Sequence, residues 1–228
     1  THTAGATAVE NVSLSGTNGA LEVTVTGITA GAATSGLQKY TVTGDNDVKL
    51  IAAGDQIDSS TLTNSGTGDV SLKITAADVG NLEGFGVLGG GIELSTAAGT
   101  HTYTLASGNT VTSSVDANVL SFDANDTAKT STLTLNLDND TNGITTAKFE
   151  TVTINGAATN ALTTGALSLA GADATITSAN DVSLTTLDGY SSITVTGDSV
   201  TSTGNIGGTT EGNDITITST NETVIGGT

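Results

Sequence analysis

The stretch that decides the fold begins Thr132-Leu133-Thr134, and the same Thr-x-Thr pattern returns at residues 151–153, 175–177, 194–196 and 216–218. Successive copies start 19, 24, 19 and 22 residues apart. A repeat of about 20 residues is typical of a solenoid, in which each coil stacks on the previous one. The repeat therefore predicts a parallel β-helix for the second half of this all-β chain.

The alternation of hydroxyl and aliphatic residues also predicts the core of that solenoid. In a strand, successive side chains point to opposite faces, so each Thr-x-Thr places two threonines outward and one aliphatic residue inward. Stacking of coils then forms one interior column from the middle residues, namely Leu133, Val152, Ile176, Val195 and Ile217.

Short alternating runs that end at Gly, Asn or Asp predict strands along the whole chain. These runs are Leu21–Thr26, Tyr40–Thr43, Val48–Ile51, Val70–Thr75, Ile92–Thr96, Thr102–Leu105, Val119–Phe122, Thr132–Leu137, Thr151–Ile154, Ala174–Thr177, Val182–Thr185, Ile193–Thr196 and Ile215–Thr218. Helical patterns are almost missing, and the best candidate is Ala76–Phe85. Spacing is irregular in the first half, so the solenoid is expected to be irregular there.

Two alternatives stay open at this point. Tandem antiparallel β-sandwiches also show short strands, spaced about 8–12 residues apart. A similarity between residues 21–44 and 133–156 suggests two related modules, 1–128 and 129–228, whereas one continuous solenoid over 1–228 explains the same pattern.

Composition excludes several function classes. The chain has 228 residues, 47 Thr, 30 Gly, five Lys, no Arg and a net charge of −18, so it lacks the clustered cations that nucleic-acid binding requires. The absence of Cys excludes disulfides, thiolate metal sites and thiol nucleophiles. No apolar run approaches the ~18–20 residues that span a bilayer, so no membrane insertion is expected.

Acidic residues gather at turns together with Asn and Gly, and this pattern is typical of calcium sites. Calcium prefers six to eight oxygen ligands, which carboxylates and main-chain carbonyls of flexible loops supply. Residues 138–143 have the spacing of the first half of a calcium loop, with Gly143 at the sharp turn. The predicted calcium ligands are Asp45, Asp47, Asp123, Asp126, Asp138, Asp140, Asn142 and Asp214.

A second calcium signal is rich in glycine. Residues 207–217 read Gly-Gly-Thr-Thr-Glu-Gly-Asn-Asp-Ile-Thr-Ile. Calcium-binding β-helices use Gly-Gly-x-Gly-x-Asp-x-apolar-x, and this stretch matches that nonapeptide except for two extra residues before Gly212. We therefore expect Ca²⁺ as the cofactor of the chain.

The repeated strands resemble those of RTX-type bacterial surface-layer proteins and their type I-secreted relatives. The similarity rests on residues 133–137 (Leu-Thr-Leu-Asn-Leu), 147–154 (Ala-Lys-Phe-Glu-Thr-Val-Thr-Ile), 173–177 and 192–197. It implies a secreted, extracellular, calcium-binding protein that assembles with copies of itself into a lattice on the cell surface. Cell-surface polysaccharide is a further expected partner. This chain departs from the family because it lacks an uninterrupted nonapeptide array.

Three other functions compete with a structural role in a surface layer. A calcium-dependent adhesin or glycan-binding module is the main alternative. Outward Thr-x-Thr rows also suit ice binding, although such rows need near-constant coil length and these spacings vary from 19 to 24 residues. An enzyme is not expected, because Arg is absent and neither His2 nor His101 lies in a Ser-His-Asp order.

Overall fold

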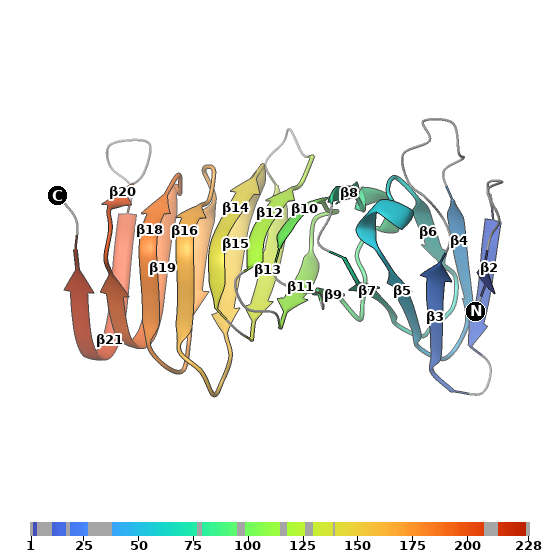
Figure 1. Ribbon diagram of the computed structural model, residues 1–228, viewed down its shortest axis with the longest axis horizontal. Helices are drawn as coiled ribbons and strands as arrows, with labels where there is room; N and C mark the ends of the chain where they lie inside the picture. Colours follow the sequence, from blue (N-terminus) through green and yellow to red (C-terminus); the bar gives the residue numbers. More distant parts are fainter. Residues whose placement is uncertain are drawn as a thin grey trace.

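The computed structural model describes residues 2–3, 11–16, 19–26, 38–76, 79–94, 99–114, 118–125, 130–138, 140–207 and 214–226. The strands of these residues pair in parallel and stack as a β-solenoid of about 8 turns. Figure 1 shows the coils following one another along the long axis, with the two ends of the chain at opposite ends of the stack. The predicted β-solenoid is confirmed. The alternative, tandem antiparallel β-sandwiches, is wrong because the strands pair in parallel.

One ladder of strands runs the whole length of the solenoid, and we call it the long ladder. It is continued at the C-terminal end by the first halves of two long strands, β19 (Ser192–Ser202) and β21 (Asp214–Ile225). Its other members are β1 (His2–Thr3), β3 (Leu21–Thr26), β5 (Val48–Ala52), β7 (Val70–Ile74), β9 (Ile92–Leu94), β11 (Asn109–Ser113), β13 (Ser131–Leu137), β15 (Phe149–Gly156) and β17 (Asp173–Thr177).

A second ladder forms the opposite wall, and the second halves of β19 and β21 continue it. Its other strands are β8 (Val79–Asn81), β10 (Thr100–Thr104), β12 (Asn118–Asp123), β14 (Thr141–Ala147), β16 (Leu162–Ser168), β18 (Val182–Asp188) and β20 (Ile206–Gly207).

The N-terminal part of the solenoid has a third wall. A three-stranded sheet of β2 (Asn11–Gly16), β4 (Lys39–Gly44) and β6 (Thr61–Asn64) forms it. Two short 3-10 helices continue the stack, because η2 (Glu83–Phe85) packs against β6 and η1 (Gly54–Gln56) packs against β8. Beyond η2 the coils described have two walls joined by turns.

An aliphatic column fills the interior along the long ladder. Its members pair in register on successive coils: Val23, Leu50, Leu72, Ile92, Val111, Leu135, Ile154, Ile176, Val195 and Ile217. From Leu50 to Val195 each side chain is at most 4% exposed. The inward direction of the middle residue in each Thr-x-Thr is therefore confirmed.

The predicted register of this column was wrong at one step. Val152 pairs with Ala174, and it is Ile154 that pairs with Ile176. The 24-residue spacing between two Thr-x-Thr copies is therefore a coil of 22 residues plus a shift of two along the strand. A shift of two preserves the inward direction of every side chain, because the strand period is two.

One further detail differs from the sequence prediction. The helix candidate 76–85 is wrong, because its described residues include β8 and η2; Gly80 and Gly84 both lie against the backbone of the preceding coil. The ladders pair β11 with β13 and β12 with β14, so paired strands lie on both sides of the predicted division between 1–128 and 129–228, which stays a prediction. No helix within the described ranges is long and apolar enough to cross a bilayer.

Candidate functional site

The predicted calcium ligands lie at several separate places on the solenoid. Asp45 and Asp47 lie in the turn between β4 and β5, and Asp123 ends β12. The other described members are Asp138 and Asp140 before β14, Asn142 within β14, and Asp214 at the start of β21. Asp126 lies outside the described residues, as do residues 208–213 of the glycine-rich stretch.

Several turn carboxylates accept a hydrogen bond from the backbone of the next coil. Oδ1 of Asp47 accepts the N–H of Asp69 at 2.9 Å, and Oδ1 of Asp140 accepts the N–H of Thr163 at 3.2 Å. Outside the predicted set, Oδ1 of Asp58 and Oδ1 of Asp181 do the same at 2.6 and 3.1 Å, accepting the N–H groups of Asn81 and Ser199. Charge-assisted bonds of this kind link each turn to the backbone of the next coil.

These carboxylates, which we call the inter-coil carboxylates, have a structural role that the sequence prediction missed. The two at positions 58 and 181 were not predicted as functional residues. The signal that could have found them is an acidic residue placed one coil before the end of a strand, as for Asp58 and the last residue of β8, or before a register shift, as for Asp181 and β19.

Other predicted ligands have protein partners as well. One carboxylate oxygen of Asp123 lies 3.0 Å from Nζ of Lys148, and the other accepts the N–H of Asn125 at 2.7 Å. Oδ1 of Asp45 accepts a hydrogen bond from Thr67 at 3.0 Å. Each of these groups still has oxygen lone pairs that face solvent, because a carboxylate offers about four acceptor sites.

Calcium requires several such oxygens at one point. Within the part of the chain that the structure describes, no three His, Cys, Asp or Glu side chains are close enough together to hold a metal ion. The segment 138–143 is not wholly a loop, since Thr141 begins β14 and Asn142 is an exposed strand residue. Calcium binding therefore stays a prediction that rests on sequence pattern and charge.

The outer surface of the long ladder carries two continuous columns of polar side chains. We call these twelve positions the threonine face. One column is Thr110, Thr134, Thr153, Thr175, Thr194 and Thr216; the other is Thr112, Asn136, Asn155, Thr177, Thr196 and Thr218. None of these positions holds a charged residue.

The side chains of the threonine face lie on the outer surface of the solenoid. All twelve residues are exposed or half-buried. Within the described residues, none of the ten threonines makes a side-chain hydrogen bond to another residue, whereas Asn155 donates to Asn136 at 3.0 Å. Because the strands are parallel, the hydroxyls repeat every ~4.8 Å from coil to coil and every ~6.6 Å along a strand.

The outer surface of the long ladder is charged in its N-terminal part. Nζ of Lys49 and Nζ of Lys73 lie 2.9 and 2.8 Å from the two carboxylate oxygens of Glu93. The hydrogen bonds from Lys73 and Lys49 lower the pKa of Glu93 below its usual value, and the bond to Glu93 raises the pKa of Lys49. We call Lys49, Lys73 and Glu93 the charged patch.

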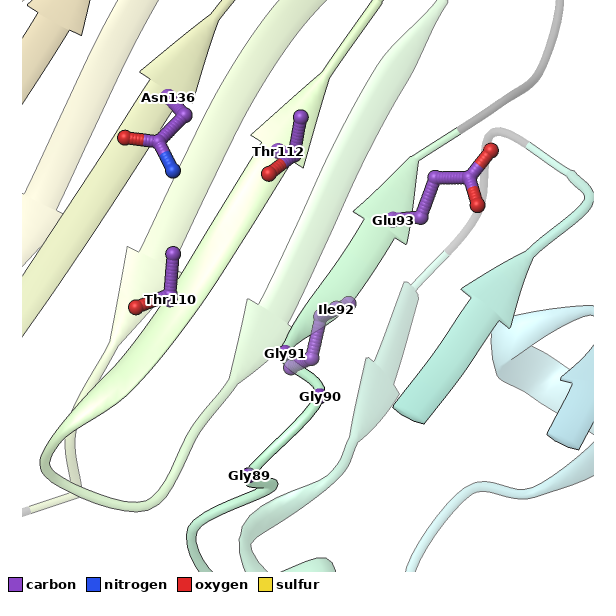
Figure 2. Close-up of a pocket in the computed structure, with 8 residues that line it drawn as sticks. All are labelled: Gly89, Gly90, Gly91, Ile92, Glu93, Thr110, Thr112 and Asn136. Carbon is purple, nitrogen blue, oxygen red and sulfur yellow. The ribbon is translucent and has the colours of Figure 1, made fainter. Parts of the chain in front are cut away.

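A hollow of about 330 Å³ lies where the charged patch meets the threonine face, and residues of both line it. Figure 2 shows that it lies over Gly89, Gly90 and Gly91, with Glu93 on one side and Asn136 on the other. Gly91 has φ = 72°, a conformation that favours glycine, and a Cβ there would lie 3.0 Å from the carbonyl oxygen of Thr110. Because these glycines carry no side chains, they do not fill the hollow that they line.

Aromatic rings are absent from every one of these surfaces. The six aromatic residues of the chain are at most 4% exposed, and they are Tyr40, Phe85, Tyr103, Phe122, Phe149 and Tyr190. His101 is fully buried, with Nδ1 3.4 Å from the hydroxyl of Tyr103. His101 is thus enclosed in the core next to a tyrosine.

Comparison with known proteins gave no match to a protein-family model, a curated protein or a solved structure.

Proposed function

We propose that this chain is a structural component of a secreted bacterial surface layer, and that it assembles with copies of itself in the presence of calcium. The observation that carries the proposal is a rigid parallel solenoid with net charge −18 and carboxylates at successive turns. A stack of hydrogen-bonded coils suits a spacer or lattice element, because it is stiff along its axis and each coil supports the next.

The net negative charge of the chain is the reason why the proposal includes calcium. A net charge far from zero keeps copies apart by self-repulsion. Divalent cations that bind between the turn carboxylates of two copies remove that repulsion and supply a bridge, since each Asp keeps free lone pairs. Assembly is then confined to the calcium-rich extracellular space, and cell-surface polysaccharide is the proposed anchor of the layer.

The experiment compares the purified chain in chelator and in millimolar calcium by light scattering and circular dichroism. We expect larger particles with calcium and no change with the same concentration of magnesium, because Mg²⁺ dehydrates reluctantly. The double variant Asp45→Asn, Asp47→Asn is expected to weaken the calcium response, whereas Glu222→Gln, which removes one exposed charge elsewhere, serves as the control. The same folded monomer with and without calcium would contradict the proposal.

A second candidate function is binding to ice, and the register of the threonine face favours it. The uneven spacing of the Thr-x-Thr copies argues against ice binding, yet the register of the strands aligns ten threonines in two columns. A flat, uncharged array of hydroxyl and methyl groups can hold an ordered layer of water.

Thermal hysteresis tests this second candidate. We expect a gap between melting and freezing points that Thr175→Lys abolishes, because a charged side chain in the middle of the array disrupts ordered water. Thr145→Lys, at an exposed position of β14 on the opposite wall, is the matched control. A chain without measurable hysteresis has no ice-binding function.

The adhesin or glycan-binding alternative has less support. Sugar rings are commonly held against aromatic faces, and all six aromatic rings of this chain are in the core. A glycan site would depend on hydroxyl, amide and carboxylate groups alone, such as those around the hollow in Figure 2. A glycan array with and without calcium tests this alternative.

A further inference from the structure

A polar column lies inside the solenoid, on the wall opposite the long ladder. Register places Asn118, Thr141, Thr164 and Leu184 at the same inward position of successive strands β12, β14, β16 and β18. Their exposed fractions are 0, 4, 1 and 1%. Three polar side chains are therefore stacked in an interior that is otherwise largely aliphatic.

The first member of this column has protein partners. Oδ1 of Asn118 accepts the N–H of Gly99 at 3.2 Å, and its Nδ2 donates to Oγ of Ser113 at 3.2 Å. By contrast, Oγ1 of Thr141 and Oγ1 of Thr164 have no hydrogen-bond partner in the structure. Buried polar groups in native proteins nearly always have a partner, either protein or ordered water.

The spacing of the two strands suits one water molecule that bridges the two hydroxyls. They belong to hydrogen-bonded parallel strands, whose spacing is ~4.8 Å. A water molecule that makes two O–H···O bonds of ~2.8 Å spans a gap of that size at a normal angle. Each hydroxyl can donate or accept, so the bridge needs no particular orientation.

The side chains at these positions also leave room. Leu184 fills the same inward position one coil further on. Thr carries one heavy atom fewer than Leu and branches closer to the backbone, so two stacked threonines leave space that two stacked leucines would fill. Space of this kind between polar groups is where buried water is found.

We infer that the solenoid core binds an ordered water molecule between β14 and β16, bridging Oγ1 of Thr141 and Oγ1 of Thr164. The water joins two coils that otherwise contact each other through ladder hydrogen bonds and aliphatic side chains.

Substitution by valine tests this inference, because valine has the shape of threonine without the hydroxyl. Thr141→Val and Thr164→Val are each expected to lower Tm by about 2–4 °C. Each substitution removes one hydroxyl from the bridge and leaves the other hydroxyl and the water with an incomplete set of hydrogen bonds. The Tm of the double variant is expected to be no lower than that of the less stable single variant, because the second substitution removes the hydroxyl that the first one leaves without its bridge. The control is Thr175→Val on the outer surface. Its change in Tm measures the effect of the intrinsic strand preference of valine.

A high-resolution crystal structure of the unchanged chain gives the direct measurement. Density for a water within hydrogen-bond distance of both hydroxyls supports the inference. A dry contact between the two threonines, or single valine variants that raise Tm with additive effects, would overturn it, because removing an unpaired buried hydroxyl is stabilising.

Discussion

The N-terminal and C-terminal parts of the solenoid share one ladder but use it differently. Between residues 38 and 94 the ladder is one of three walls, and its outer surface carries the charged patch. Between 130 and 226 the described coils have two walls, and the outer surface carries uncharged columns of Thr and Asn. A common interior therefore does not dictate a common surface or cross-section.

The difference shows where coils gain stability. In the N-terminal part, packing extends to a third side, where Tyr40 and Phe85 are in ring contact with centroids 5.8 Å apart. In the C-terminal part, the walls meet at tight turns such as the one at Lys148, which has φ = 62°. Stacking in register is the feature that both parts need.

The largest expected effect comes from breaking the shared aliphatic column. Ile154→Ala and Leu50→Ala, one in each part, should each reduce the free energy of unfolding by about 2–5 kcal/mol, because both side chains are fully buried. Chemical denaturation measures the loss. Ile217→Ala is the control, since Ile217 is only partly buried and should cost less; equal losses at all three positions would contradict a continuous core.

Alkaline pH should affect the N-terminal part through Tyr40. Burial raises the pKa of Tyr40 to about 12 from 10.0. The stability linked to this group is fully present below pH 10 and is lost as pH rises toward 12, by about 2–3 kcal/mol. Thermal melts between pH 9 and 12 follow the loss, and Tyr40→Phe should reduce the slope; an unchanged slope would mean that other groups dominate. Burial also raises the pKa of Tyr190 in the C-terminal part.

Inter-coil carboxylates should matter similarly in both parts. Asp47→Ala and Asp140→Ala each remove an acceptor for a backbone N–H of the next coil, and by analogy with helix-capping residues each should cost about 1 kcal/mol. Asp140→Asn is the informative control, because it keeps an oxygen acceptor and removes only the charge. If Asp140→Asn lowers the stability of chelator-treated protein as much as Asp140→Ala does, the charge of Asp140 and not its hydrogen bond is responsible.

The smallest expected effect concerns the charged patch, which only the N-terminal part possesses. Glu93→Gln should cost less than about 1 kcal/mol, because the ion pairs are partly exposed. The pKa of Glu93 is lowered, so its contribution is present above the usual value of about 4.5 and is lost as pH falls through the folded-state pKa. Urea denaturation at pH 3 and pH 7 measures this, with Asn155→Asp as a matched insertion of charge in the C-terminal part.

Strand positions were predictable because their signal is local. Every predicted strand overlaps an observed one, and Leu21–Thr26 coincides with β3. Strands such as β14 and β16 were missed because Thr141–Ala147 and Leu162–Ser168 contain glycine and few aliphatic residues, which weakens the alternation. The candidate site was predictable only as a set of acidic turns, since the hydrogen bonds that Asp47 and Asp140 accept from the next coil depend on coil length.

By itself, the sequence determined that this chain forms short strands with aliphatic residues inside and threonines outside, because the alternation with a period of two is visible in neighbouring residues. The tertiary structure decided which residues share a row. Turns of different length absorb the uneven spacing, so Ile154 lies against Ile176 and ten threonines align in two columns. Register depends on hydrogen bonds between residues some 20 positions apart, and no local pattern specifies those pairings.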